Sequence, residues 1–288
     1  MKTSIPLTVG RWPGAVLVFF LTGWLASCSQ PPQTFVLRAN YEPVGKVLTY
    51  LLTSHRVGKA YRDGVVAREI DTKIEAEVIY TTQKILPNGN AMVLEENRWH
   101  WDEPVDSSGN VKRKTEEYTY NQEIAPNGRV VSFRMVGQST PQWENYARQY
   151  YEQGVPVFPD SPVAVDSGWT QSVTVDLPDG SKAEAATTYR IKGTTYKLGY
   201  QCVVIEYQGN MVFPLFVDPA DSTALQGIDR VEAKGILYYG YEAGIAVSSD
   251  ESRRLNIDRT SIKEGKKVHM TAEYEEVIGY ALTGTKTL

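Results

Sequence analysis

The 288-residue sequence predicts a mainly β protein with antiparallel sheets, organised as two similar β-rich halves linked by one amphipathic helix near residues 141–153. Most segments alternate apolar and polar residues, which is the period of a strand with one buried face. Three Pro-Asx-Gly turns, at 87–89, 126–128 and 178–180, separate pairs of such segments and indicate hairpins. The two halves can form either a curved half-barrel or one continuous sheet.

The N-terminus has the anatomy of an export signal. Lys2 and Arg11 precede an apolar run at 14–25, and this run is shorter than the roughly 20 residues that a membrane-spanning helix needs. We therefore expect residues 1–27 to be a signal peptide that is removed.

The end of this leader, Leu25, Ala26 and Ser27 followed by Cys28, resembles the lipobox of bacterial lipoproteins. The resemblance implies that Leu25, Ala26 and Ser27 are recognised by the signal peptidase. Cys28 would then become the first mature residue and carry an S-diacylglycerol and an N-acyl chain such as palmitate, with residues 28–34 as a tether. The alternative is an ordinary signal peptide cleaved near Ser27, with Cys28 an incidental thiol.

A lipobox implies an extracytoplasmic protein whose first partner is a membrane, reached through the anchor. Two or three acyl chains hold a protein stably at a bilayer, so no further anchor is needed. In a bacterium with two membranes, Ser29 after the cysteine resembles the pattern of lipoproteins sorted to the outer membrane. The predicted location is then the periplasmic side of that membrane.

The first β-rich half is expected over residues 35–138. Its hairpins surround the first two Pro-Asn-Gly turns, and a turn before Gly45 leads into its opening strand. Residues 35–50 are expected to form a turn followed by a strand, and the later strand segments are 73–82, 91–101, 111–120 and 129–136.

Residues 139–162 are expected to connect the halves through a helix and a proline-rich stretch. Thr140 can cap the helix, Pro141 suits its first turn, and Gly154 can end it. The apolar stripe is more typical of a core-facing surface than of a ligand platform. Its members are Trp143, Tyr146, Ala147, Tyr150 and Tyr151.

The second β-rich half is expected over residues 163–288, with strands at 173–175 and 183–191 around the third turn. Alternation over 196–204 predicts another strand that points Cys202 into the core. A lipidated Cys28 cannot pair with this thiol, so Cys202 is expected to be buried and to act as a small hydrophobic residue.

Three short motifs, together with the lipobox, resemble those of a class of uncharacterised bacterial lipoproteins. They are a Gly-x-x-x-x-Tyr opening strand at Gly45–Tyr50, a Ser-Gly-Trp start at Ser167–Trp169 and a Gly-x-x-Tyr-Tyr hairpin at Gly235–Tyr239. The resemblance implies an architecture and brings no activity or catalytic residues with it.

The net charge and the lack of familiar catalytic motifs limit the classes of function that the sequence allows. Without the leader, 28 basic and 34 acidic residues give a formal charge of −6, which disfavours a nucleic-acid partner. None of the familiar nucleophile, zinc-protease, phosphate-loop or dinucleotide motifs occurs in the sequence, so we expect no enzymatic activity and no cofactor.

No metal site is expected either. His55, His100 and His269 each stand alone in a differently patterned segment, and the acidic stretch Asp218–Asp229 does not have the spacing of a known calcium loop. We interpret that stretch as a polar loop between strands.

The weak ligand-binding candidates are Trp99 and Trp101, which share one face of a strand while His100 takes the other. They form either a core pair or a stacking surface for sugar, with Asp102 or Glu103 bonding hydroxyls. The leading hypothesis is a non-enzymatic binding or structural lipoprotein of the cell envelope with a protein partner. The first alternative is a carrier or chaperone for a lipid or other hydrophobic ligand in a concave sheet that the helix closes; the second is a glycan hydrolase.

Overall fold

The computed structural model describes residues 33–104, 111–137, 141–177, 180–215, 226–263 and 266–288, and Pro32–Leu288 form one compact unit. The predicted signal peptide and Cys28 lie outside the described residues. The structure contains one helix, α1 (Pro141–Gly154), and strands whose bounds are β1 Thr34–Phe35, β2 Lys46–Arg62, β3 Val65–Ile85, β4 Ala91–Pro104, β5 Val111–Ile124, β6 Val130–Met135, β7 Val163–Ala164, β8 Gly168–Asp176, β9 Lys182–Lys197, β10 Tyr200–Leu215, β11 Gln226–Gly240, β12 Ile245–Lys263 and β13 Lys266–Thr287.

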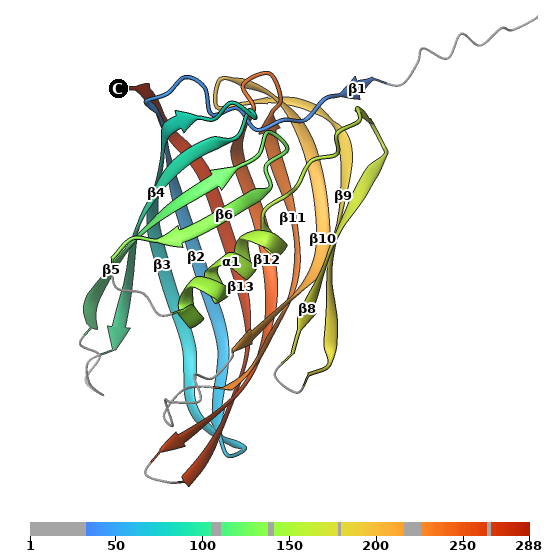
Figure 1. Cartoon of the computed structure of the whole chain (residues 1–288). Coiled ribbons are helices and arrows are strands. Elements are labelled where there is room, and N and C mark those ends of the chain that lie inside the picture. Colours follow the sequence, from blue (N-terminus) through green and yellow to red (C-terminus); the bar gives the residue numbers. More distant parts are fainter. Residues whose placement is uncertain (1–32, 105–110, 138–140, 178–179, 216–225, 264–265) are drawn as a thin grey trace, which may run out of the picture. The chain divides into compact units, whose positions relative to one another are not determined.

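Eleven of these strands form one antiparallel sheet with the order β6-β5-β4-β3-β2-β13-β12-β11-β10-β9-β8. The chain enters the sheet at its centre, reaches one edge at β6, crosses through α1 to the other edge at β8, and returns to pair β13 with β2. The sheet is curved and does not close (Figure 1). This confirms the mainly β, curved, antiparallel fold with one helix. We call β2–β6 the first wing and β8–β13 the second wing.

The three predicted Pro-Asx-Gly hairpins are confirmed. Gly89, Gly128 and Gly180 have φ values of +83°, +85° and +82°, and they connect β3 to β4, β5 to β6 and β8 to β9. Glycine adopts this left-handed region without the steric clash of a side chain, which is why these turns form here.

The single strand predicted over 196–204 is wrong. The structure has a hairpin there, because Leu198 and Gly199 form a two-residue turn with φ of +49° and +86° between β9 and β10. Cys202 is nevertheless fully buried, as expected, and burial raises the pKa of its thiol. Tyr196 and Leu198, which the alternation had placed beside it, are exposed.

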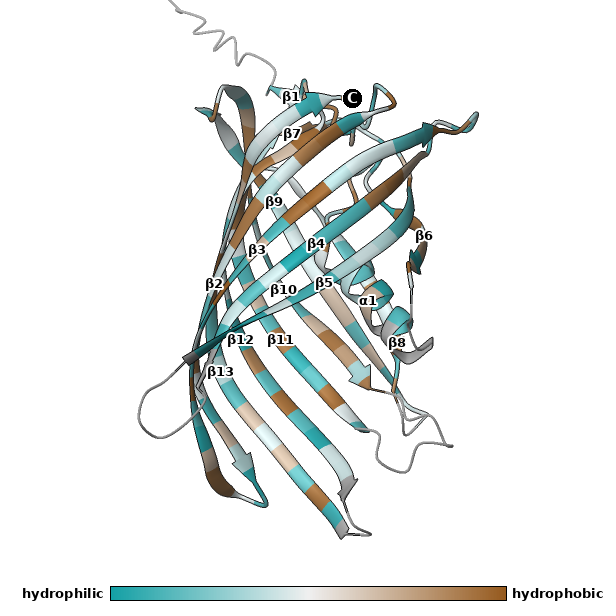
Figure 2. Cartoon of the chain, turned by 90° about the vertical axis from the view of Figure 1, so that its left-hand side faces the viewer, coloured by the Kyte–Doolittle hydropathy of each residue, from teal (hydrophilic) through white to brown (hydrophobic). Residues whose placement is uncertain are grey.

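Alternating side chains give the sheet a charged convex face and a concave face that holds the core, and Figure 2 shows this alternation along the strands. On the convex face, Glu75 pairs with Arg113 and Arg254 pairs with Glu275 in the open. Two clusters of buried residues fill the end of the unit where β2 begins. One cluster includes Tyr50, Val78 and Leu282, and the other includes Phe35, Ile205 and Tyr239.

Three ion pairs lie on the concave face, and each has a carboxylate that is nearly inaccessible. Glu276 is 2 % exposed and accepts hydrogen bonds from Arg56 Nε at 2.7 Å and from Ser54 Oγ at 2.5 Å. The other two pairs are Glu251 with Arg253 and Asp229 with Arg259. A carboxylate removed from water needs such partners, so these pairs fix the sheet locally.

The segment that precedes β2 covers one end of the core. Phe35 and Leu37 point inward and are buried, whereas Val36 and Arg38 face outward. The backbone of this segment bonds to two loops at the same end, with Ala39 N donating to Pro126 O at 2.7 Å and Asn40 N donating to Gly244 O at 2.8 Å. Among the described residues, no helix combines the length and the apolar character that crossing a membrane would require.

Candidate binding pocket at the open edge of the sheet

Helix α1 lies on the concave side and contacts both wings through two consecutive tyrosines. Tyr150 accepts a hydrogen bond from Arg253 Nη2 at 3.1 Å and stacks on Phe213 of the second wing, with ring centroids 6.0 Å apart. Tyr151 donates its hydroxyl to Glu95 Oε1 at 2.5 Å and packs against Phe133 of the first wing. The helix therefore braces two wings that share no hydrogen bond at their outer edges (Figure 1).

Hydrogen bonds from the side chains of Gln153 and Gln171 connect the C-terminal part of α1 to the second wing. Gln153 Nε2 donates to Val212 O at 2.9 Å, and Val212 N donates back to Gln153 Oε1 at 2.8 Å, so one side chain satisfies both backbone groups of a β10 residue. From β8, Gln171 Nε2 donates to the carbonyl oxygens of Glu152 and Val155, and its Oε1 accepts from Val157 N. These bonds satisfy carbonyl groups that the end of the helix leaves open.

Under the brace, Glu95 is a carboxyl group that the fold removes from water. It is 2 % exposed and accepts hydrogen bonds from the side chains of Tyr151, Asn97 and Gln122. Burial raises its pKa above the ordinary value of 4.5, and the three hydrogen bonds oppose that rise. The net direction is upward because desolvation is the largest cause.

Because the pKa of Glu95 differs between the folded and the unfolded chain, its contribution to the free energy of unfolding depends on pH. The folded protein binds a proton at Glu95 at a higher pH than the unfolded chain does, so this contribution is complete below the ordinary value and is lost as pH rises through the raised pKa. Each pKa unit between the two states corresponds to about 1.4 kcal/mol. We expect the free energy of unfolding of the native protein to increase relative to that of Glu95→Gln as pH falls from neutral toward 4.5.

Urea unfolding of both proteins over that pH range tests this expectation. Both proteins share every other titrating group, so their difference isolates position 95. A difference that stays constant with pH would show that Glu95 has the same pKa in the folded and unfolded chain.

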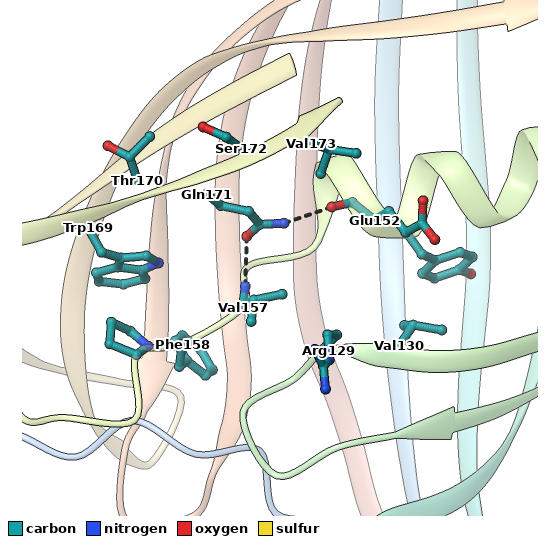
Figure 3. A pocket seen from close by; sticks show the side chains of 12 residues that line it. Arg129, Val130, Glu152, Val157, Phe158, Trp169, Thr170, Gln171, Ser172 and Val173 are labelled. Carbon is teal, nitrogen blue, oxygen red and sulfur yellow. Dashed lines mark hydrogen bonds between the residues drawn. The ribbon is translucent and has the colours of Figure 1, made fainter. Parts of the chain in front are cut away.

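A pocket of about 550 Å³ lies where the sheet fails to close, between β6, α1 and β8 (Figure 3). Its mouth carries polar groups from both sides, including Arg129, Glu152 and Gln171. Its apolar walls come from Val130, Val157, Phe158, Trp169 and Val173. This volume is within the range of about 300 to 1,000 Å³ that is typical of small-molecule sites.

Trp169 is the main aromatic wall of the pocket. Its ring stacks on Tyr189 at a centroid distance of 4.9 Å and meets the edge of Phe158 at 6.1 Å, so two neighbours fix its orientation. The indole Nε1 is buried and has no hydrogen-bond partner among the described residues. A buried indole N–H normally finds an acceptor, but neighbouring atoms cover this one, so a ligand can supply an acceptor only after a local shift of the pocket wall.

The residues proposed from sequence lie away from this pocket. Trp99 and Trp101 are half-buried on the concave face, opposite Ala76 and Ile74 of β3, while His100 occupies the convex face as predicted. Asp102 is exposed, and the side chain of Glu103 lies outside the description. The structure brings neither tryptophan into the pocket.

The histidines and the acidic stretch form no joint site within the described chain. His55 bonds Asp71, His100 bonds Thr115 and His269 bonds Asp258, each on its own strand pair. The described residues contain no group of three or more His, Cys, Asp or Glu side chains that could hold a metal. Residues 218–225 of the acidic stretch lie outside the described residues, and its last member, Asp229, lies in β11 and forms an ion pair with Arg259.

Sequence reasoning missed the pocket because its walls come from three separated segments. In the sequence, Trp169 belongs to the Ser-Gly-Trp strand start and Phe158 lies within the 139–162 connection, and neither pattern points to a pocket. An aromatic residue between Pro156 and Pro159, in a chain that must return to a sheet edge, was the one available signal. The side chains of Trp143 and Tyr146 from the predicted helical stripe lie outside the description, but Tyr150 and Tyr151 face the sheet.

No family model and no curated protein matches this chain. A solved structure concerned with lipid–protein interactions in lipovitellin is similar to it, with a TM-score of 0.41 and 13 % sequence identity over 86 % of this chain. The chain spans 26 % of the length of that structure's chain.

Proposed function

We propose that this protein is a non-enzymatic, lipid-anchored protein of the cell envelope that binds a hydrophobic ligand in the pocket between β6, α1 and β8. The observation that carries the proposal is a pocket with mostly apolar walls beside the buried Trp169 N–H, which has no partner among the described residues. The ligand is an amphipathic molecule with an acyl chain, whose carbonyl or carboxylate accepts the indole hydrogen. Arg129 at the mouth can meet an anionic head group.

The anchor is part of the same proposal and is supported by the Leu25–Cys28 lipobox. Attachment of a diacylglyceryl group to the Cys28 thiol through a thioether, cleavage before Cys28 and acylation of its new amine would place the protein on the outer face of a bacterial inner membrane or, given Ser29, on the periplasmic side of the outer membrane. Mass spectrometry of the mature N-terminal peptide tests this directly. An unmodified Cys28, or an N-terminus that begins elsewhere, would refute the anchor.

Ligand binding is tested by titrating a fluorescent fatty acid into the form that begins at Ser29, which keeps the whole compact unit. We expect Trp169→Phe to weaken binding about tenfold, because it keeps the aromatic wall and removes one hydrogen-bond donor. Trp101→Phe is the matched control, since Trp101 lies on the concave face outside the pocket, and we expect it to bind like the native protein.

Lipids extracted from the purified protein provide a second readout of the same idea. An acyl lipid present in the native protein and depleted in Trp169→Phe supports the pocket. If the native protein binds no fatty acid and retains no lipid, the ligand-binding role is wrong. Loss of binding in Trp101→Phe alone would move the site to the concave face.

A further inference from the structure

The strand directions place Gln33 and several turns at the same end of the unit. Gln33 is the first described residue. Its carbonyl oxygen accepts a hydrogen bond from Val165 N, which shortly precedes β8. The β9–β10 turn, the β11–β12 turn and the start of β2 lie at this end, which we call the tether end. The β2–β3 turn lies at the opposite end (Figure 1).

Two turns at opposite ends have the same backbone conformation and different residues. Asp63 and Gly64 at the far end have φ of +49° and +81°, and Leu198 and Gly199 at the tether end have φ of +49° and +86°. Aspartate and asparagine tolerate the left-handed region and are the ordinary choice at the first position. Leucine is disfavoured there, because its side chain meets the following carbonyl group.

Leu198 is also exposed, with 56 % of its surface accessible. Neither backbone preference nor burial therefore explains this residue, which contradicts both local rules at once. Val36 and Val44 are exposed at the same end, at 48 % and 53 %. Exposed valines occur at the far end too, at Val65 and Val66, so exposure alone does not distinguish the two ends. The two ends differ in the first residue of the turn, which is leucine at the tether end and aspartate at the far end.

The tether limits the distance between this end and the membrane. Gln33 is five residues after Cys28, and five residues span at most about 18 Å even when fully extended. If Cys28 is lipidated, as proposed above, Gln33 stays within this distance of the lipid surface. The far end is removed from it by the length of strands such as β2, which has 17 residues.

We propose that the β9–β10 turn inserts Leu198 into the leaflet that holds the Cys28 anchor, as a second contact between the protein and the lipid surface. The occupant of this exposed apolar tip is the bilayer, since the tether holds Gln33, at the same end of the unit, close to the lipid surface. Leu198, and not the neighbouring Lys197, makes the contact with the lipid. The Lys197 ammonium group lies over the Tyr238 ring at 3.6 Å and pairs with Asp250 at 3.8 Å. The insertion rests on the proposed anchor and fixes which end of the molecule faces the membrane.

The test uses the mature lipidated protein reconstituted in vesicles of phosphatidylethanolamine and phosphatidylglycerol. A polarity-sensitive dye is attached at Leu198→Cys in one sample and at Asp63→Cys in another, which are the same positions of the two turns. We expect the dye at 198 to be quenched by spin-labelled acyl chains and protected from aqueous iodide at least several-fold relative to the dye at 63. Equal access of iodide to both positions would overturn the insertion.

Two other outcomes are separable. Shielding from iodide at 198 without quenching by the lipid label would mean that a protein partner or a second copy covers the tip, which also overturns the proposal. Failure of the anchor is read independently from the mass of the N-terminal peptide and from loss of vesicle flotation. A lipidated protein with a water-exposed tip therefore refutes the insertion and leaves the anchor intact.

Leu198→Asn separates membrane contact from a structural role without a dye. Asparagine is favoured in the left-handed region, so we expect the thermal midpoint to stay the same or rise. We expect vesicles to slow amide hydrogen exchange of residues 196–201 about tenfold in the native protein and to leave it unchanged in Leu198→Asn. A lower thermal midpoint in this variant would show that the fold itself needs Leu198, contrary to the proposal.

Discussion

Replacing Glu276 by alanine is expected to destabilise the protein by about 3 to 5 kcal/mol, which is the usual result of removing one partner from a buried ion pair. The carboxylate accepts hydrogen bonds from Ser54 and from Arg56, and it is 2 % exposed. Its loss leaves the Arg56 charge and the Ser54 hydroxyl on the concave face without this acceptor. Urea unfolding followed by circular dichroism measures the change.

The adjacent residue is a matched control. Glu275 lies on the convex face of the same strand, where it pairs with Arg254 at 3.6 Å while both side chains are largely exposed. An exposed ion pair contributes less than about 1 kcal/mol, so Glu275→Ala should have a small effect. Similar losses in the two variants would mean that strand β13, rather than burial of the carboxylate, determines the cost.

The second large effect is expected at the brace. Gln153→Met keeps the volume of the side chain and removes the two hydrogen bonds to Val212. Because Gln153 is 3 % exposed, the N–H and C=O groups of Val212 would be left without these partners, at a cost of about 1 to 3 kcal/mol each. We expect the free energy of unfolding to fall by at least about 2 kcal/mol. Hydrogen exchange should also speed up in α1 before it does in β2 or β13.

Gln149, one helical turn earlier, provides the comparison for this prediction. It is also buried, at 8 % exposure, but its side-chain oxygen has no hydrogen-bond partner among the described residues. Gln149→Met removes an unsatisfied acceptor, so we expect it to be neutral or stabilising. If both substitutions destabilise equally, packing of α1 rather than the Gln153 clamp holds the helix in place.

Sequence patterns predicted the local elements well because each depends on nearby residues. The Pro-Asx-Gly turns require only a glycine in the left-handed region, and α1 requires only Pro141, its helical stripe and Gly154. The 196–204 prediction failed because alternation continues through a two-residue turn. Leu198-Gly199 lacks the Asn or Asp that normally marks such a turn.

Local sequence patterns did not predict the candidate site. Which strands become sheet edges depends on the pairing of β2 with β13, for which no short-range signal exists. Glu95, Tyr151 and Trp169 acquire their environments only after α1 crosses between those edges. Unlike the pocket, the lipobox is recognised from consecutive residues and needs no folded environment. It remains a prediction.

The pairing of β2 with β13 has a consequence for how the chain folds. Lys46 lies opposite Thr287, so this central ladder joins residues from nearly opposite ends of the described chain. Pairings of such high sequence separation form slowly, because the intervening loop must close first. The edge of β2 that pairs with β13 therefore stays unpaired until β13 docks on it. We expect removal of β13 to expose an aggregation-prone edge at the middle of the sheet.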